Sequence, residues 1–131
     1  DEDVKLNELI SGPHFDVGER RALAATLVER SFTPKGTERQ LAAISASRDR
    51  TELLAAVTAP TLVIHGLLDP LVKPSGGVAT AMAVPGSRLL ALPDMGHDLP
   101  QPRFTEIRDA ILDNIRRASS AHPHREAENF H

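Results

Sequence analysis

The chain has 131 residues, which is enough for one globular domain and too few for two of ordinary size. Hydrophobic residues make up 40% and charged residues 25%, a balance that excludes a disordered or fibrous chain. The net charge of -3 comes from interspersed signs without a Lys/Arg cluster, and aromatic residues make up only 3%, so we expect no nucleic-acid partner.

Targeting signals and cysteine chemistry are also missing from the sequence. No apolar run approaches the roughly 20 residues of a membrane helix, so we expect no membrane span, and the opening DEDVKLNELI does not read as a secretory signal. The absence of cysteine excludes disulfides, a thiolate nucleophile and a thiolate metal site. This composition favours a cytoplasmic protein.

The first 58 residues have the pattern of a helical segment. A short helix within 3–10 is expected to precede a Gly- and Pro-containing loop over 11–18, and residues 19–30 are rich in helix formers. Thr37 and Gln40 have the spacing of a capping box, which predicts a helix over 37–47.

A further short helical segment follows in this part of the chain. Asp49 and Glu52 repeat the capping-box spacing, and the apolar residues behind them are expected to be buried, namely Leu53, Leu54 and Val57.

The pattern changes after residue 58, where short continuous apolar runs are typical of parallel strands covered on both faces. Strands are predicted over 61–65 and 88–93, and helices over 76–84 and 103–119. The fold class is therefore α/β, with a strand–helix–strand–helix unit over 59–118, a helical segment over 1–58 and a tail over 119–131.

Asp69 and His97 each follow one of the two predicted strands by a few residues. Because the carboxyl ends of neighbouring parallel strands share one edge of a sheet, we expect the two side chains to meet there. A carboxylate that accepts one imidazole N–H leaves the other ring nitrogen free to take a proton from a nucleophile. Gly66 and Gly96 supply backbone freedom in the same loops.

These loops carry a resemblance to a known family. PTLVIHGLLDPLV over 60–72 and GSRLLALPDMGHDLP over 86–100 resemble the C-terminal part of an α/β-hydrolase. By this resemblance Asp69 is the acid and His97 the base of a catalytic triad. The helices before residue 60 are similar to the end of a lid inserted ahead of these strands. The resemblance implies hydrolysis of an ester or related acyl bond without a cofactor.

The sequence departs from that family at the nucleophile. The family carries its serine in a G-x-S-x-G turn ahead of the acid and the base. None of the eight serines has that context; they lie at 11, 31, 45, 47, 75, 87, 119 and 120. We therefore expect the serine in a segment preceding residue 1, and an inactive chain without it. The expected partners are this N-terminal half of the hydrolase or a second copy of the chain, together with a small acyl or ester substrate.

Two other interpretations stay open. In the first, the chain is a non-catalytic hydrolase-like module or a self-associating fragment that binds a partner through an exposed sheet edge. In the second, His65 joins Asp69 and His97 in a metal site with two histidines and one carboxylate. In this position His65 more simply makes structural hydrogen bonds.

Several residues near the two loops have less specific interpretations. Asp98 is interpreted as a solvated loop carboxylate or a cap of the following helix, and Asp94 in the same way. Candidates for contact with an acyl group or with substrate are Met82, Met95, Leu99, His14, Phe15 and Phe32, with Met82 more typical of a core residue. The histidines at 122, 124 and 131 suggest at most a weak metal site.

Overall fold

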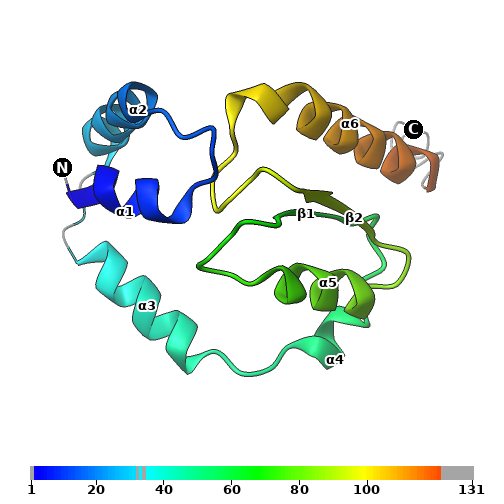
Figure 1. Ribbon diagram of the computed structural model, residues 1–131. Helices are drawn as coiled ribbons and strands as arrows, with labels where there is room; N and C mark the ends of the chain where they lie inside the picture. Colours follow the sequence, from blue (N-terminus) through cyan, green and yellow to red (C-terminus); the bar gives the residue numbers. More distant parts are fainter. Residues whose placement is uncertain (1, 32, 34, 122–131) are drawn as a thin grey trace, which may run out of the picture.

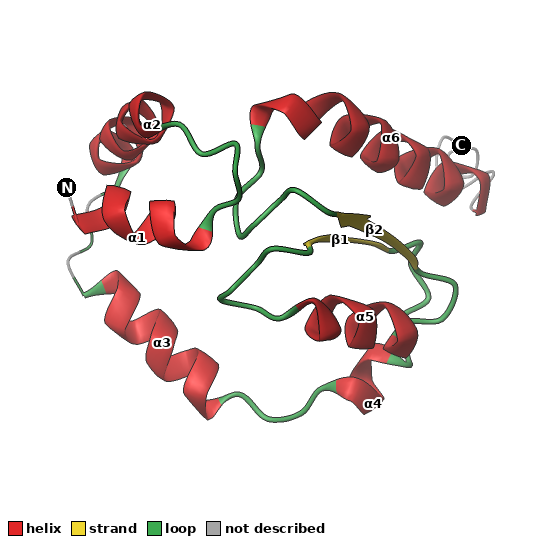
Figure 2. Cartoon of the chain, viewed as in Figure 1, coloured by secondary structure: helices red, strands yellow, loops and turns green. Residues whose placement is uncertain are grey.

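A computed structural model describes residues 2–31, 33 and 35–121 as a mixed α/β fold (Figure 1). Figure 2 shows that helices make up most of the chain and that the strands are short. The elements in chain order are α1 (Glu2–Ile10), α2 (Val17–Arg30), α3 (Gly36–Ala46), α4 (Thr51–Leu54), β1 (Leu62–Gly66), α5 (Pro74–Ala83), β2 (Arg88–Leu92), the 3-10 turn η1 (Gln101–Arg103) and α6 (Phe104–Ala121).

The sheet of the described residues consists of two parallel strands, β1 and β2. Leu62 pairs with Arg88, and the register continues to Gly66 opposite Leu92. Helix α5 packs on both strands, α6 contacts β1, and the two helices lie on opposite sides of the sheet (Figure 1). The predicted order of strand, helix, strand and helix is confirmed, and it places the carboxyl ends of both strands at one edge.

The core is small and lies near the carboxyl end of β2. Leu92, Met95 and Ile107 are buried, with Ile64 and Leu90 packed against them. Met95 belongs to the loop after β2, so this loop is anchored in the core by an apolar side chain. Four apolar residues recur along α6 at three- and four-residue steps. Of these, Ile107 is buried, whereas the other three stay largely exposed: Phe104, Ile111 and Ile115.

The first two helices pack on each other, and α2 begins earlier than predicted. Asp16 acts as its N-cap, because the Oδ1 of Asp16 accepts a hydrogen bond from the Glu19 amide at 2.7 Å. The helix therefore starts at Val17 rather than at residue 19. The predicted short helix near the N-terminus is confirmed as α1.

Two predictions for α3 and α4 are wrong. No side chain caps α3, which begins at Gly36 after the Gly36 amide donates to the Thr33 carbonyl at 2.8 Å. The turn therefore starts the helix one residue before Thr37, which removes Thr37 from the capping position. None of the three apolar residues predicted to be buried in and after α4 is buried, since Leu53 is 72% exposed and Leu54 and Val57 are half-buried. The element that contacts this short helix is α5, and it does not cover them fully.

The C-terminal helix extends beyond its predicted end. α6 continues to Ala121, and the remainder of the predicted tail, with the histidines at 122, 124 and 131, lies outside the described residues. Among the helices that are described, none has both the length and the apolar character needed to span a bilayer. The division into a lid-type segment over 1–58 and a core segment over 59–118 stays a prediction.

Candidate active site

Asp69 lies in a tight turn directly after β1. The amide of Leu68 donates to the carbonyl of Met95 at 3.0 Å, so the pairing of the two chain segments continues beyond the strands. The amide of Asp69 then donates to the carbonyl of Gly66 at 3.2 Å and closes the turn. These bonds bring Asp69 against the loop that follows β2, which was the expected meeting point.

The Asp69 carboxylate is buried and fully engaged, with its side chain only 5% exposed. Its Oδ1 accepts the amides of Leu71 at 2.8 Å and Val72 at 2.9 Å, and its Oδ2 accepts Nδ1 of His97 at 2.8 Å. Burial alone raises the pKa of Asp69, but the bonds from Val72, His97 and Leu71 outweigh it and hold the pKa below its ordinary value. The carboxylate is therefore ionised at neutral pH.

The ionised carboxylate determines which nitrogen of His97 carries the proton. Because Oδ2 of Asp69 only accepts, Nδ1 of the neutral ring must be the N–H donor, and Nε2 keeps its lone pair. Within the described residues, Nε2 has no hydrogen-bond partner, and the side chain is 41% exposed. The structure thus joins the two predicted residues in one pair, while their catalytic role stays a prediction.

Gly66 allows β1 to approach the loop that carries His97. A Cβ at Gly66 would overlap the carbonyl oxygens of Met95 and Gly96, which are backbone atoms that cannot turn away. The glycine is therefore required by close approach of two backbones rather than by its φ angle.

Replacing Gly66 by Ala is expected to lower the free energy of unfolding by about 1–3 kcal/mol, because the added methyl group overpacks this contact. Gly76→Ala in α5 is the matched control, since its Cβ would meet Val72 Cγ1 at an ordinary 3.5 Å. That variant is expected to gain up to about 1 kcal/mol from helix propensity. Urea unfolding followed by circular dichroism checks both, and equal effects would contradict the prediction.

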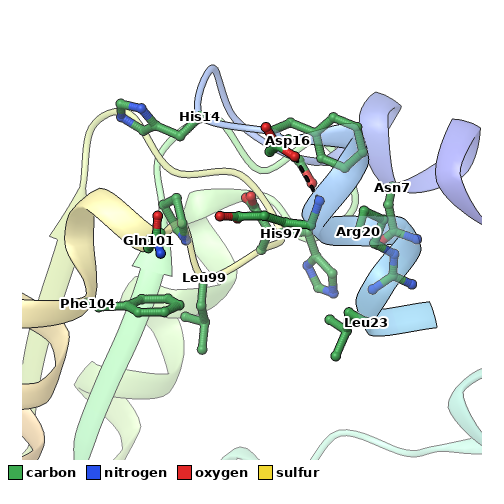
Figure 3. A pocket seen from close by; sticks show the side chains of 14 residues that line it. Asn7, His14, Asp16, Arg20, Leu23, His97, Leu99, Gln101 and Phe104 are labelled. Carbon is green, nitrogen blue, oxygen red and sulfur yellow. Dashed lines mark hydrogen bonds between the residues drawn. The ribbon is translucent and has the colours of Figure 1, made fainter. Parts of the chain in front are cut away.

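Two cavities meet at His97. One, of about 500 Å³, lies between the first two helices and the loop after β2, and the other, of about 240 Å³, lies beside Asp69 at the end of β1. Figure 3 shows Leu99 and Phe104 on one side of His97 in the larger cavity, with Leu23 of α2 on the other side. The free nitrogen of the ring is therefore accessible from a space that could hold a small molecule.

The other candidate residues divide between the cavities and the surface. His14 and Phe15 line the larger cavity, Met95 lines the smaller one, and Leu99 lines both. Met82 lines neither of them and is 82% exposed, so neither a pocket role nor the core role suggested for it fits. Phe32 lies outside the described residues.

His65 has a structural role in the fold. Its Nε2 donates to the Val72 carbonyl at 3.0 Å, and the ring lies so close to Gly77 that a Cβ there would be 2.7 Å from it. Across the described part of the chain, no group of three metal-binding side chains is found. The alternative of a metal site at His65, Asp69 and His97 therefore has no support from the geometry.

Asp94 is more than a solvated loop carboxylate, because it is the centre of a hydrogen-bonded network of charged side chains. Its two oxygens accept Nε2 of His14 at 2.6 Å and Nε of Arg103 at 2.9 Å, and Arg103 also donates to Glu106 at 3.0 Å. The hydrogen bond from Arg103, followed by that from His14, lowers the pKa of Asp94 to about 2. No sequence pattern indicated this contact, since His14 and Asp94 are 80 residues apart.

The lowered pKa of Asp94 predicts an acid-dependent loss of stability. A carboxyl group whose pKa is lower in the folded state than in the unfolded state stabilises the fold at any pH above its unfolded-state pKa. This stabilisation is lost as the pH falls through the folded-state pKa. For Asp94 this interval runs from 3.8 down to about 2. We expect Asp94→Asn to be less stable than the wild type at pH 7 and to lose less stability over this interval, as measured by thermal unfolding.

Comparison with known proteins gives partial similarity to esterases. The rhodomycin D methylesterases DauP of Streptomyces sp. (strain C5) and DnrP of Streptomyces peucetius are each 33% identical to the chain over 66 residues. The match covers 50% of this chain and 22% of each relative, so the chain spans less than a quarter of their length. No protein-family model matches the chain. Half of the chain is thus similar to enzymes that are hydrolases.

Proposed function

We propose that the chain supplies the acid and the base of a serine-type α/β-hydrolase that cleaves an ester or related acyl bond. The observation that carries the proposal is the hydrogen bond of 2.8 Å that Nδ1 of His97 donates to the buried Asp69 carboxylate, with the exposed His97 side chain lining a cavity. The partial similarity to methylesterases supports the same reaction class.

In the proposed reaction, Nε2 of His97 takes the proton of a serine hydroxyl as the serine oxygen attacks the ester carbonyl. The same nitrogen then gives this proton to the leaving alcohol as the acyl-serine forms. Water repeats the sequence and releases the acid, which regenerates the serine. Asp69 keeps the proton on Nδ1 and stabilises the imidazolium cation. These steps need no cofactor.

We propose that the serine comes from outside these 131 residues. Within the described residues, no serine or threonine hydroxyl bonds to His97, and no serine of the sequence has the required context. We propose that the missing part docks at the free edge of β1. The residues of β1 are partly or fully buried, whereas those of β2 are mostly exposed. In the described residues, β1 pairs only with β2. A further parallel strand on β1 would complete its pairing.

The substrate we propose is a small ester whose acyl or alcohol group fits the cavity of about 500 Å³ beside His97. Apolar side chains of this cavity suit a hydrocarbon or ring group. Methyl esters are the first candidates, because the two relatives are methylesterases.

The test compares the 131-residue chain with a longer gene product that would carry the proposed serine segment ahead of it. With p-nitrophenyl and methyl esters, the chain alone is expected to show background hydrolysis, since loss of the nucleophile costs on the order of a million-fold in kcat. The longer protein is expected to turn over these esters. Enzyme-like turnover by the chain alone would contradict the proposal and require another nucleophile.

The exposed sheet edge also favours a second candidate, a non-catalytic module that associates with a second copy of itself. Several large apolar side chains near this sheet are exposed, including Leu67, Leu71 and Val78. Sedimentation equilibrium distinguishes the two candidates. A discrete dimer of the chain, combined with an inactive longer gene product, would favour the module over the hydrolase.

A further inference from the structure

The loop that carries His97 is held from a second side by the turn after α1. The backbone amide of His97 donates to the carbonyl of Ile10 at 2.8 Å. In the opposite direction, the amide of Gly12 donates to Oδ1 of Asp98 at 3.2 Å. The turn after α1 and the loop before η1 lie side by side in Figure 1. Two residues in succession, 97 and 98, are thus tied to one short segment far away in the sequence.

Two glycines make this contact possible. A Cβ on Gly96 would lie 2.5 Å from the Ile10 carbonyl oxygen and 2.6 Å from the Gly12 nitrogen. A Cβ on Gly12 would lie 2.8 Å from the Asp94 carbonyl oxygen and 2.9 Å from the Gly96 nitrogen. Since all of these atoms belong to the backbone, side chains at either position would force the two segments apart.

Asp98 therefore has a different role from the one its sequence position suggested. It is neither a freely solvated carboxylate nor a cap of the next helix, because Pro100 and not Asp98 precedes η1, and its Oδ1 holds the Gly12 amide. Asp69 fixes the ring of His97, whereas Asp98 and the turn at Ile10–Gly12 fix the backbone from which that ring extends.

We infer that Asp98 is a positioning residue that aligns His97 by binding the Gly12 amide, an inference that rests on the proposed function. Asp98 also lines both cavities, so a direct contact with substrate is the competing role. The two roles differ in the kinetic constant they affect. A misplaced catalytic base lowers kcat. Loss of a substrate contact that is equally strong in the ground state and the transition state raises KM instead.

The experiment measures kcat and KM for p-nitrophenyl butyrate with the longer gene product carrying Asp98→Ala, Asp98→Asn or Asp98→Glu. Asn keeps an oxygen in the Oδ1 position and loses the charge, whereas Glu keeps the charge and displaces the oxygens. We expect Ala and Glu to lower kcat 10- to 100-fold with KM changed less than threefold, and Asn to retain at least a third of kcat. Asp109→Ala, an exposed carboxylate on α6, is the matched control.

Each outcome decides between positioning, charge and substrate contact. If Asp98→Glu keeps its kcat and Asp98→Asn loses it, the charge is what matters and the inference is overturned. An effect confined to KM would also overturn it. If Asp98→Ala does not fold, the comparison of Asn with Glu gives the same decision. Asp69→Asn in the same assay separates the positioning role of Asp98 from the proposed hydrolase function. If kcat falls in Asp69→Asn but not in Asp98→Ala or Asp98→Glu, only the positioning role is contradicted. If kcat falls in none of the variants, the proposed function is contradicted as well.

Discussion

Replacing His97 by Gln is expected to lower kcat for ester hydrolysis by the longer gene product on the order of a million-fold, the loss that follows removal of a triad base. Gln occupies a similar volume but cannot accept a proton at neutral pH. Because the His97 side chain is 41% exposed and its backbone amide keeps the bond to Ile10, the fold is expected to persist.

The assay combines steady-state kinetics with a thermal unfolding curve for each variant. Arg108→Gln is the matched control, since Arg108 is 63% exposed on α6 and pairs only with Asp109 among the contacts described. This control is expected to keep the activity and the unfolding temperature of the wild type. A folded His97→Gln enzyme with less than a tenfold loss of kcat would contradict the role of His97 as the base.

Asp69→Asn is expected to lower kcat about 10⁴-fold, by reversing the tautomer of His97. The Asn oxygen can still accept the amides of Leu71 and Val72, which retains the turn. Its NH₂ group then faces Nδ1 of His97 and donates to it. The ring proton is forced onto Nε2, which can no longer take a proton from serine.

Nitrogen NMR of the imidazole rings measures this change directly, alongside kcat. The wild type is expected to show the Nδ1–H form of His97 and Asp69→Asn the Nε2–H form. Asp69→Ala should behave differently, because the amides of Leu71 and Val72 lose their acceptor and the turn after β1 is weakened. A fully active Asp69→Asn enzyme, or an unchanged tautomer, would contradict the role given to Asp69.

The meeting of Asp69 and His97 could be predicted because it depends on local patterns and one rule of topology. Two short apolar runs with a helix between them predict parallel neighbours, and the carboxyl ends of parallel neighbours share an edge. Each residue then needs only to lie a few positions beyond its strand. The observed hydrogen bond follows from sequence spacing without knowledge of any other contact.

The environment of the pair could not be predicted, because it depends on contacts between distant segments. Gly12 and Asp98 are 86 residues apart, and nothing in either local pattern indicates that one amide binds the other carboxylate. The same holds for the pairing of His14 with Asp94. The capping-box prediction for Thr37 failed for the opposite reason, since a local turn at Gly36 started the helix first.

The most direct test of the proposed hydrolase is the position at which a serine-reactive fluorophosphonate labels the longer gene product. We predict one labelled serine outside residues 1–131, found by mass spectrometry of the digested protein, with labelling lost in His97→Gln because the serine is no longer activated. A label on one of the eight serines of this chain, or labelling that persists without His97, would contradict the assignment of Asp69 and His97 as acid and base.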